Sequence, residues 1–142
     1  MKRDKMELSS NHKRILSVTA RKVETTLNEM EEILKGKLSK NKTAQIIPDY
    51  NEEKRNELIK VIERIRTENE RMFDELSLKP LELTEERVIK AKSANLWTIL
   101  IDSSSVHLKN YGALPDEEAA KIDSYIDNLL TSLEILMKTE NA

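Results

Sequence analysis

The sequence contains no cysteine, and it has only two glycines and three prolines among its 142 residues. The absence of cysteine excludes a disulfide framework, thiolate zinc sites and a cysteine nucleophile. Aromatic residues make up 4% of the chain and charged residues 35%, a balance typical of long helices rather than of β-sandwiches or barrels. No apolar run approaches the roughly 20 residues of a membrane span, and no hydrophobic signal region follows the charged start. We therefore expect an all-helical, cytoplasmic protein.

Charge is distributed unevenly along the chain, although the net charge is only -2. Residues 1–42 contain 11 Lys and Arg against 6 Asp and Glu, whereas residues 43–142 contain 13 against 20. Such asymmetry indicates either an anionic partner for the basic part or complementarity between neighbouring helices. We favour the second interpretation.

Four segments carry start signals of helices. Ser9 or Ser10 is an acceptable N-cap for the first segment, and Gly36 is a reasonable stop. Asp49 with Glu52 three residues later predicts a capping box for the second. The third and fourth are expected to start at Thr84 and Pro115, each followed by acidic residues that suit the positive end of a helix.

Apolar residues recur at helical spacing in all four segments and form one seam on each. The four seams, in chain order, are Leu16, Ala20, Val23, Leu27, Met30 and Leu34; Leu58, Ile62, Ile65, Asn69, Met72 and Leu76; Ile89, Ser93, Leu96, Leu100, Ser103 and His107; and Ala119, Ile122, Ile126, Leu129, Leu133 and Leu136.

The expected helices have matching lengths of roughly 24 to 27 residues, or about 36 to 40 Å at 1.5 Å per residue. The joints at 77–84 and 112–114 are short, which favours antiparallel neighbours. We predict a four-helix bundle with up-down-up-down topology, formed by residues 1–142 as one domain. A flexible tail at 1–8 and a long first loop at 36–49 complete this prediction.

Residues 101–112 crowd an acid, three serines, a histidine and a tyrosine into one stretch. On a helix, however, Asp102 would point about 140° away from His107, so it could not orient the imidazole as a catalytic triad requires. We therefore interpret His107 as a buried structural residue of the bundle end. The alternative is a ligand-binding or phosphoryl-accepting bundle, similar to histidine phosphotransfer domains, that uses His107 with Ser103 and Tyr111 lining the site.

None of three further polar features predicts a ligand site. Asn69 interrupts an otherwise apolar seam, and we expect its amide to be buried between helices, where it would fix their register. Neither His12 nor His107 follows an acid at the Glu-x-x-His spacing of di-iron bundles, so no metal site is predicted. The lysines of the first loop have no arginine or interleaved aromatic residues beside them, which makes nucleic acid an unfavoured partner.

The third segment carries a second apolar stripe, which contains Trp97, Ile101 and Leu108 and is offset by roughly 100° from its seam. A surplus stripe must be covered, either by Ile46 and Ile47 of the first loop, by a second copy of the chain or by an unlike protein. We therefore expect a non-enzymatic interaction module or small scaffold that self-associates, for which the sequence identifies no cofactor, metal or small-molecule substrate and no membrane contact.

Overall fold

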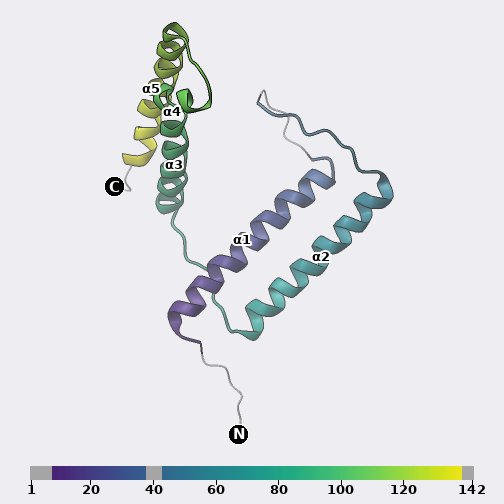
Figure 1. Cartoon of the computed structure of the whole chain (residues 1–142). Helices are drawn as coiled ribbons and strands as arrows, with labels where there is room; N and C mark the ends of the chain where they lie inside the picture. Colours follow the sequence, from purple (N-terminus) through teal and green to yellow (C-terminus); the bar gives the residue numbers. More distant parts are fainter. Residues whose placement is uncertain (1–7, 38–42, 139–142) are drawn as a thin grey trace. The chain divides into compact units, whose positions relative to one another are not determined.

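The computed structural model describes residues 8–37 and 43–138, and every regular element in these ranges is helical (Figure 1). The all-helical class predicted from the sequence is therefore confirmed. The chain divides into two compact units, Met1–Leu81 and Glu82–Ala142. The described elements are α1 (Ser10–Leu34) and α2 (Glu52–Glu75) in the first unit, and α3 (Glu85–Asp102), α4 (Ser105–Leu108), a 3₁₀ turn η1 (Lys109–Tyr111) and α5 (Asp116–Lys138) in the second.

Five α-helices are described where four were expected, because the predicted third helix ends early at Asp102. The single domain predicted for residues 1–142 stays a prediction, and each unit is a helical hairpin in its own right. Most of the predicted tail at 1–8, and residues 38–42 of the predicted loop at 36–49, lie outside the described residues.

Three long helices, α1, α2 and α3, start with a side-chain cap. In two of them the capping residue is the predicted one. The side chains of Ser9 and Thr84 accept hydrogen bonds from the third backbone amide of α1 and α3, as predicted. For α2 the expected cap is wrong, because Asn51 rather than Asp49 accepts the hydrogen bond, from the amide of Lys54 at 2.7 Å. At the end of α1, Gly36 adopts φ +73°, the left-handed conformation that glycine tolerates at a helix stop.

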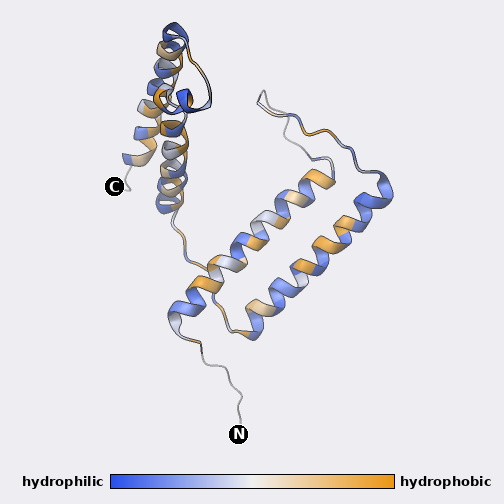
Figure 2. Ribbon diagram, in the orientation of Figure 1, coloured by the Kyte–Doolittle hydropathy of each residue, from blue (hydrophilic) through white to orange (hydrophobic). Residues whose placement is uncertain are grey.

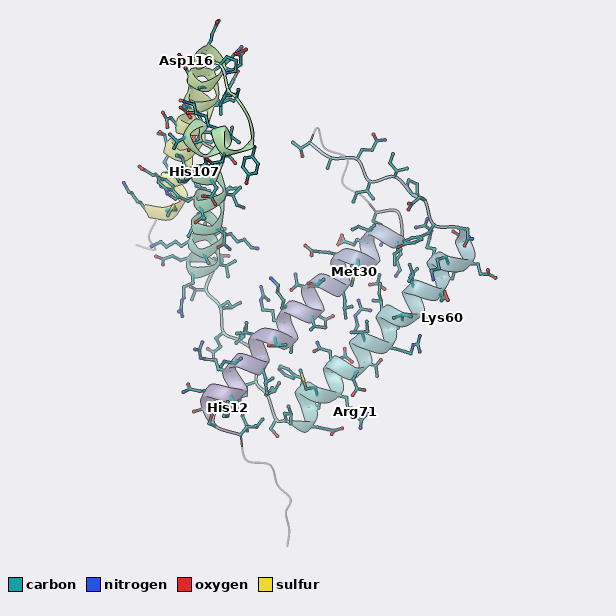
Figure 3. The ribbon with its side chains drawn as sticks, in the orientation of Figure 1. His12, Met30, Lys60, Arg71, His107 and Asp116 are labelled. Carbon is teal, nitrogen blue, oxygen red and sulfur yellow. The ribbon has the colours of Figure 1, made fainter. Side chains whose placement is uncertain are left out.

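The first unit is an antiparallel pair of helices. Figure 3 shows His12 near the start of α1 at the same end as Arg71 near the end of α2, while Met30 and Lys60 lie towards the other end. Its core is small and consists of buried Leu27, Leu34 and Ile62 with Val23, Leu58 and Ile59 packed against them.

Arg66 of α2 holds the polar side of this hairpin together. Its guanidinium donates to Glu24 and Glu31 of α1 at 3.2 and 3.1 Å and to Glu63 of its own helix at 2.7 Å. The fork of five donors on arginine suits several carboxylates at once, which lysine could not match. Only 17% of the Arg66 side chain is exposed, so solvent screens these pairs less than it screens surface pairs.

Hydrogen bonds at both ends fix how the connecting segments meet the two helices. Arg55 donates to the carbonyls of Leu34 and Tyr50, both at 3.0 Å, and so ties the end of α1 to the segment before α2. At the opposite end, the hydroxyl of Ser17 donates to the carbonyl of Lys79 at 2.9 Å. The bonds from Arg55 to Leu34 and from Ser17 to Lys79 join residues 21 and 62 positions apart in the sequence.

The second unit pairs α3 with α5, and the short α4 also contacts α5. Its buried residues are small apart from one leucine: Ser93 on α3, Ser105 on α4, and Ala119 and Leu133 on α5. Small residues allow two helices to approach closely, but they bury little apolar area. Figure 2 shows hydrophobic residues in bands along every long helix, well beyond these buried positions.

Asn69 behaves largely as predicted. Its amide nitrogen donates to the carbonyl of Ala20 on the neighbouring helix at 3.1 Å, so the predicted interhelical hydrogen bond is confirmed. The residue is partly buried, so the predicted burial between helices is met only in part. A hollow of about 470 Å³, lined by Ala20, Asn69 and Phe73 among others, opens beside it.

Replacing Leu27 tests the size of the first core. Leu27 is 2% exposed, so Leu27→Ala removes buried methyl groups and is expected to lower the free energy of unfolding by about 2–4 kcal/mol. Val18→Ala on the same helix, at an exposed position, is the control and should change stability by less than about 0.5 kcal/mol. If urea denaturation shows that both variants lose the same free energy of unfolding, the core lies elsewhere.

Replacing Asn69 tests whether its amide is a register device. Asn69→Leu loses one hydrogen bond of about 1 kcal/mol but adds apolar burial, so thermal stability should be kept or raised. Asn95→Leu, at an exposed site on α3, controls for the general effect of an added leucine. A fall of several degrees in the melting temperature of Asn69→Leu alone would show that the amide is required for stability.

Candidate functional site

The stretch 101–112 does not continue α3 as predicted. The helix ends at Asp102, and the amides of Ser103 and Ser104 bond to the carbonyls of Leu100 and Ile101 in a tighter turn. Serine side chains compete with the helical backbone for hydrogen bonds, and the hydroxyl of Ser103 indeed donates to the carbonyl of Ile99 at 3.0 Å. After this break, α4 covers only the four residues Ser105–Leu108.

Asp123 of α5 anchors the start of α4. One carboxylate oxygen accepts the backbone amide of Ser105 at 2.9 Å, and the other accepts its hydroxyl at 2.5 Å. A carboxylate at the start of a helix satisfies amides that have no partner within the helix. The hydrogen bond from the Ser105 hydroxyl, followed by that from its amide, lowers the pKa of Asp123 despite the opposing effect of burial.

His107 is exposed on α4, so the prediction of a buried seam histidine is wrong. The physical reason is the break at Ser103 and Ser104, which ends the helical phase that would have carried His107 onto the seam. Figure 3 shows His107 in the segment between α3 and α5. An acid from another helix does enter this region, but Asp123 directs both of its oxygens to Ser105 rather than to an imidazole.

The alternative site of His107, Ser103 and Tyr111 is spread over three local elements. Ser103 is partly buried at the end of α3, His107 is exposed on α4, and Tyr111 is 88% exposed at the end of η1. The Ser103 hydroxyl donates within its own helix. A phosphoryl-accepting role for His107 stays a prediction.

The buried side of α3 lies between its two apolar stripes, because Ser93 of the predicted core seam is buried and Leu100 of that seam is partly buried, as is Trp97 of the second stripe. Trp97 and Leu108 of the second stripe are partly buried, and 38% of Ile101 is exposed. Ile89 and Leu96 of the predicted core seam are instead 45% and 46% exposed. Part of the predicted core seam of α3 is therefore exposed.

Leu129 and Leu136 of α5, also predicted to be core residues, are 53% and 49% exposed. Counting 100° per residue from the buried Leu133, these two lie about 40° and 60° to one side. Ile89 and Leu96 lie about 40° and 60° to the same side of the buried Ser93.

Rotations of equal sign on two antiparallel helices lead to the same side of the plane that contains both axes. The four residues Ile89, Leu96, Leu129 and Leu136 therefore share one side of the hairpin, which we call the apolar face. The bond between Ser105 and Asp123 gives a reference level at the connected end. Counted from it, Leu96 and Leu129 lie nine and six residues away, and Ile89 and Leu136 lie 16 and 13 residues away, so the levels within each pair differ by about 4.5 Å. The apolar face thus consists of two layers with one side chain from each helix.

Ile46 and Ile47, one of the three alternative covers considered for the Trp97 stripe, belong to the first unit and are both exposed. They line a hollow of about 640 Å³ at the end of α1, where Arg55 holds the neighbouring segment. Their contact with Trp97 would join the two units and stays a prediction.

Sequence reasoning missed Asp123 entirely, and it assigned the apolar face to the core. Asp123 gave a weak signal, because a lone acid on an amphipathic helix is normally a solvated residue. Its partner Ser105 lies 18 residues away, in a segment that was expected to be an uninterrupted helix. The apolar face had a clear signal in its spacing, but the spacing does not show which neighbour covers it.

The pKa of Asp123 provides a test of the α4 anchor. A depressed pKa in the folded state means that the carboxylate stabilises the fold above the unfolded pKa of about 3.9, and that this stabilisation is lost as pH falls through the lower folded value. Ser105→Ala removes the largest cause and should raise the Asp123 midpoint in a carboxyl-detected NMR titration. Ser103→Ala, which removes a hydroxyl bonded within α3, should leave it unchanged, and a shift in both variants would contradict the assignment.

Among residues 8–37 and 43–138, no helix is both long and apolar enough to cross a membrane. The same residues contain no group of three or more acidic or histidine side chains placed to hold a metal ion. No family model matches the chain, and neither the curated proteins nor the solved structures include a significant match to it.

Proposed function

We propose that the chain is a non-enzymatic protein-protein interaction module, and that the apolar face of the α3–α5 hairpin is its contact surface. The observation that carries this proposal is the exposure of Ile89, Leu96, Leu129 and Leu136 on one side of one hairpin. Isolated exposed leucines are common in proteins, but four aliphatic side chains in two adjoining layers form a contiguous patch. Such patches mark surfaces that another protein covers.

The size of the patch indicates what kind of partner it needs. Complete burial of a leucine or isoleucine contributes about 1.5–3 kcal/mol, so covering the remaining half of each side chain contributes about 1 kcal/mol. Four side chains then supply about 4 kcal/mol in all. This gain only equals the lowest estimates of the free-energy cost of association, which are also about 4 kcal/mol. A stable complex therefore requires a partner with apolar side chains of its own.

Helices are the partner structure that this surface favours. The apolar face is the shallow groove between two antiparallel helices, and a helix lays its own apolar stripe into such grooves. A four-helix bundle belongs to this proposal, because two helices of a partner on the apolar face would complete one. The up-down-up-down bundle within a single chain stays a prediction from the sequence. We also propose a cytoplasmic location, which the cysteine-free sequence supports.

Site-specific photo-crosslinking in cells tests this function. A photoreactive residue in place of Leu96 should crosslink to a protein, because the partner covers this position. Ile135 lies about 160° around α5 from Leu133, away from the apolar face, and the same replacement there is the matched control. We expect a strong crosslinked product from position 96 and little from position 135. Equal products from both, or none from either, would contradict the proposed contact surface.

A further inference from the structure

We infer that the occupant of the apolar face is a second copy of this chain, so that two α3–α5 hairpins pair face to face about a two-fold axis. This inference rests on the proposed function, because it names the partner of the same surface. Three observations support it: the spacing of the exposed residues, the signs of the charges that surround them, and the area that the face offers.

The exposed residues have the same spacing on both helices of the apolar face, so two copies of the face can match each other. Ile89 and Leu96 are seven residues apart, and so are Leu129 and Leu136, which corresponds to about 10 Å along either helix. A two-fold axis parallel to the helices would place each layer on the same layer of the second copy. It would also place α3 beside the α5 of the second copy, so that every pair of neighbouring helices is antiparallel. Self-complementary patches close most readily by this symmetry.

The charges that border the apolar face are balanced. Glu85 and Lys92 border it on α3, about 80° and 100° from Ser93 on the side of the exposed residues. Glu118 and Lys121 border it on α5, about 60° and 120° from Leu133 on that side. All four side chains are exposed. Each helix thus contributes one acid and one base, and the border carries no net charge.

This balance favours a like partner over a strongly charged one. Residues 82–142 contain 11 Asp and Glu against 6 Lys and Arg, which would oppose pairing of two copies if the acids surrounded the face. The acids Asp123, Asp127 and Glu134 instead lie about 80° to 120° around α5 on the opposite side. A border of one sign would have indicated a partner of the other sign.

The area of the face predicts a reversible dimer. The 18 residues of α3 give a shared length of about 27 Å, and two helices side by side are about 20 Å wide. Each copy then offers roughly 500 Å², and the pair buries roughly 1,000 Å² in total. This total lies at the threshold of about 1,000 Å² for a specific interface, so dimerisation should depend on concentration in the range that centrifugation can follow.

Sedimentation of the full chain over a wide range of concentrations tests the inference. The wild type should pass from monomer to dimer, and Leu96→Glu combined with Leu129→Glu should raise the dissociation constant by roughly tenfold or more, since tenfold corresponds to 1.4 kcal/mol. Ile135→Glu is the matched control and should dimerise as the wild type does. Circular dichroism should show that all variants keep their helices.

A charge variant tests the interface without adding charge to its centre. Lys92→Glu with Lys121→Glu makes the border acidic in both copies, so dimerisation should weaken at low salt and recover as salt screens the repulsion. No change in sedimentation for this variant would overturn the face-to-face pairing.

The identity of the protein crosslinked to position 96 shows whether only this inference fails or the proposed function fails as well. A wild type that stays monomeric at every concentration overturns the second copy as occupant. If position 96 then crosslinks to an unlike protein, the proposed function stands and only the inference fails. If it crosslinks to α1 or α2 of its own chain, both fail.

Discussion

A pair of helices has only one interface, and this constraint governs both units of the structure. Each long helix carries a seam two rows wide, but one neighbouring helix covers only one row. Leu27, Ile62 and Leu133 are buried in the covered rows. Met30, Ile65 and Leu129, each about 40° or 60° around the helix from these residues, are exposed. The three exposed residues lie to the same side of their buried neighbours, although Val23 and Leu58, at a similar angle on α1 and α2, pack against the core.

Because apolar contact is non-directional, polar contacts must set the register of each pair. Arg66 reaches two glutamates of α1, and Asn69 reaches the carbonyl of Ala20 in the same helix. In the second unit the bond between Ser105 and Asp123 does the same for α4 and α5, and α4 follows α3 after the turn at Ser103 and Ser104. The apolar face depends on this bond, since a shift of a few residues between α3 and α5 would separate its two layers.

Local signals predicted the helices well, whereas long-range contacts decided the rest. The caps at Ser9 and Thr84 and the stop at Gly36 depend on residues within one turn, and all three were predictable. The break after Asp102 was not, because serines cost a helix only a few tenths of a kcal/mol each, too little to decide its end. What stabilises the break is Asp123, a residue of the next long helix.

Apolar periodicity could not predict which side of α3 is buried. A repeat of 3.6 residues fixes the angle between two stripes on α3, but not which stripe meets the neighbouring helix. Trp97 and Leu96 are adjacent in sequence and lie about 100° apart, and either could have been covered. Contact with α5 leaves Trp97 partly buried and Leu96 more exposed. A seam two rows wide is nevertheless the pattern of a helix with two neighbours, so the sequence of α3 indicates a second contact that a lone hairpin cannot supply. The apolar face is where that contact belongs.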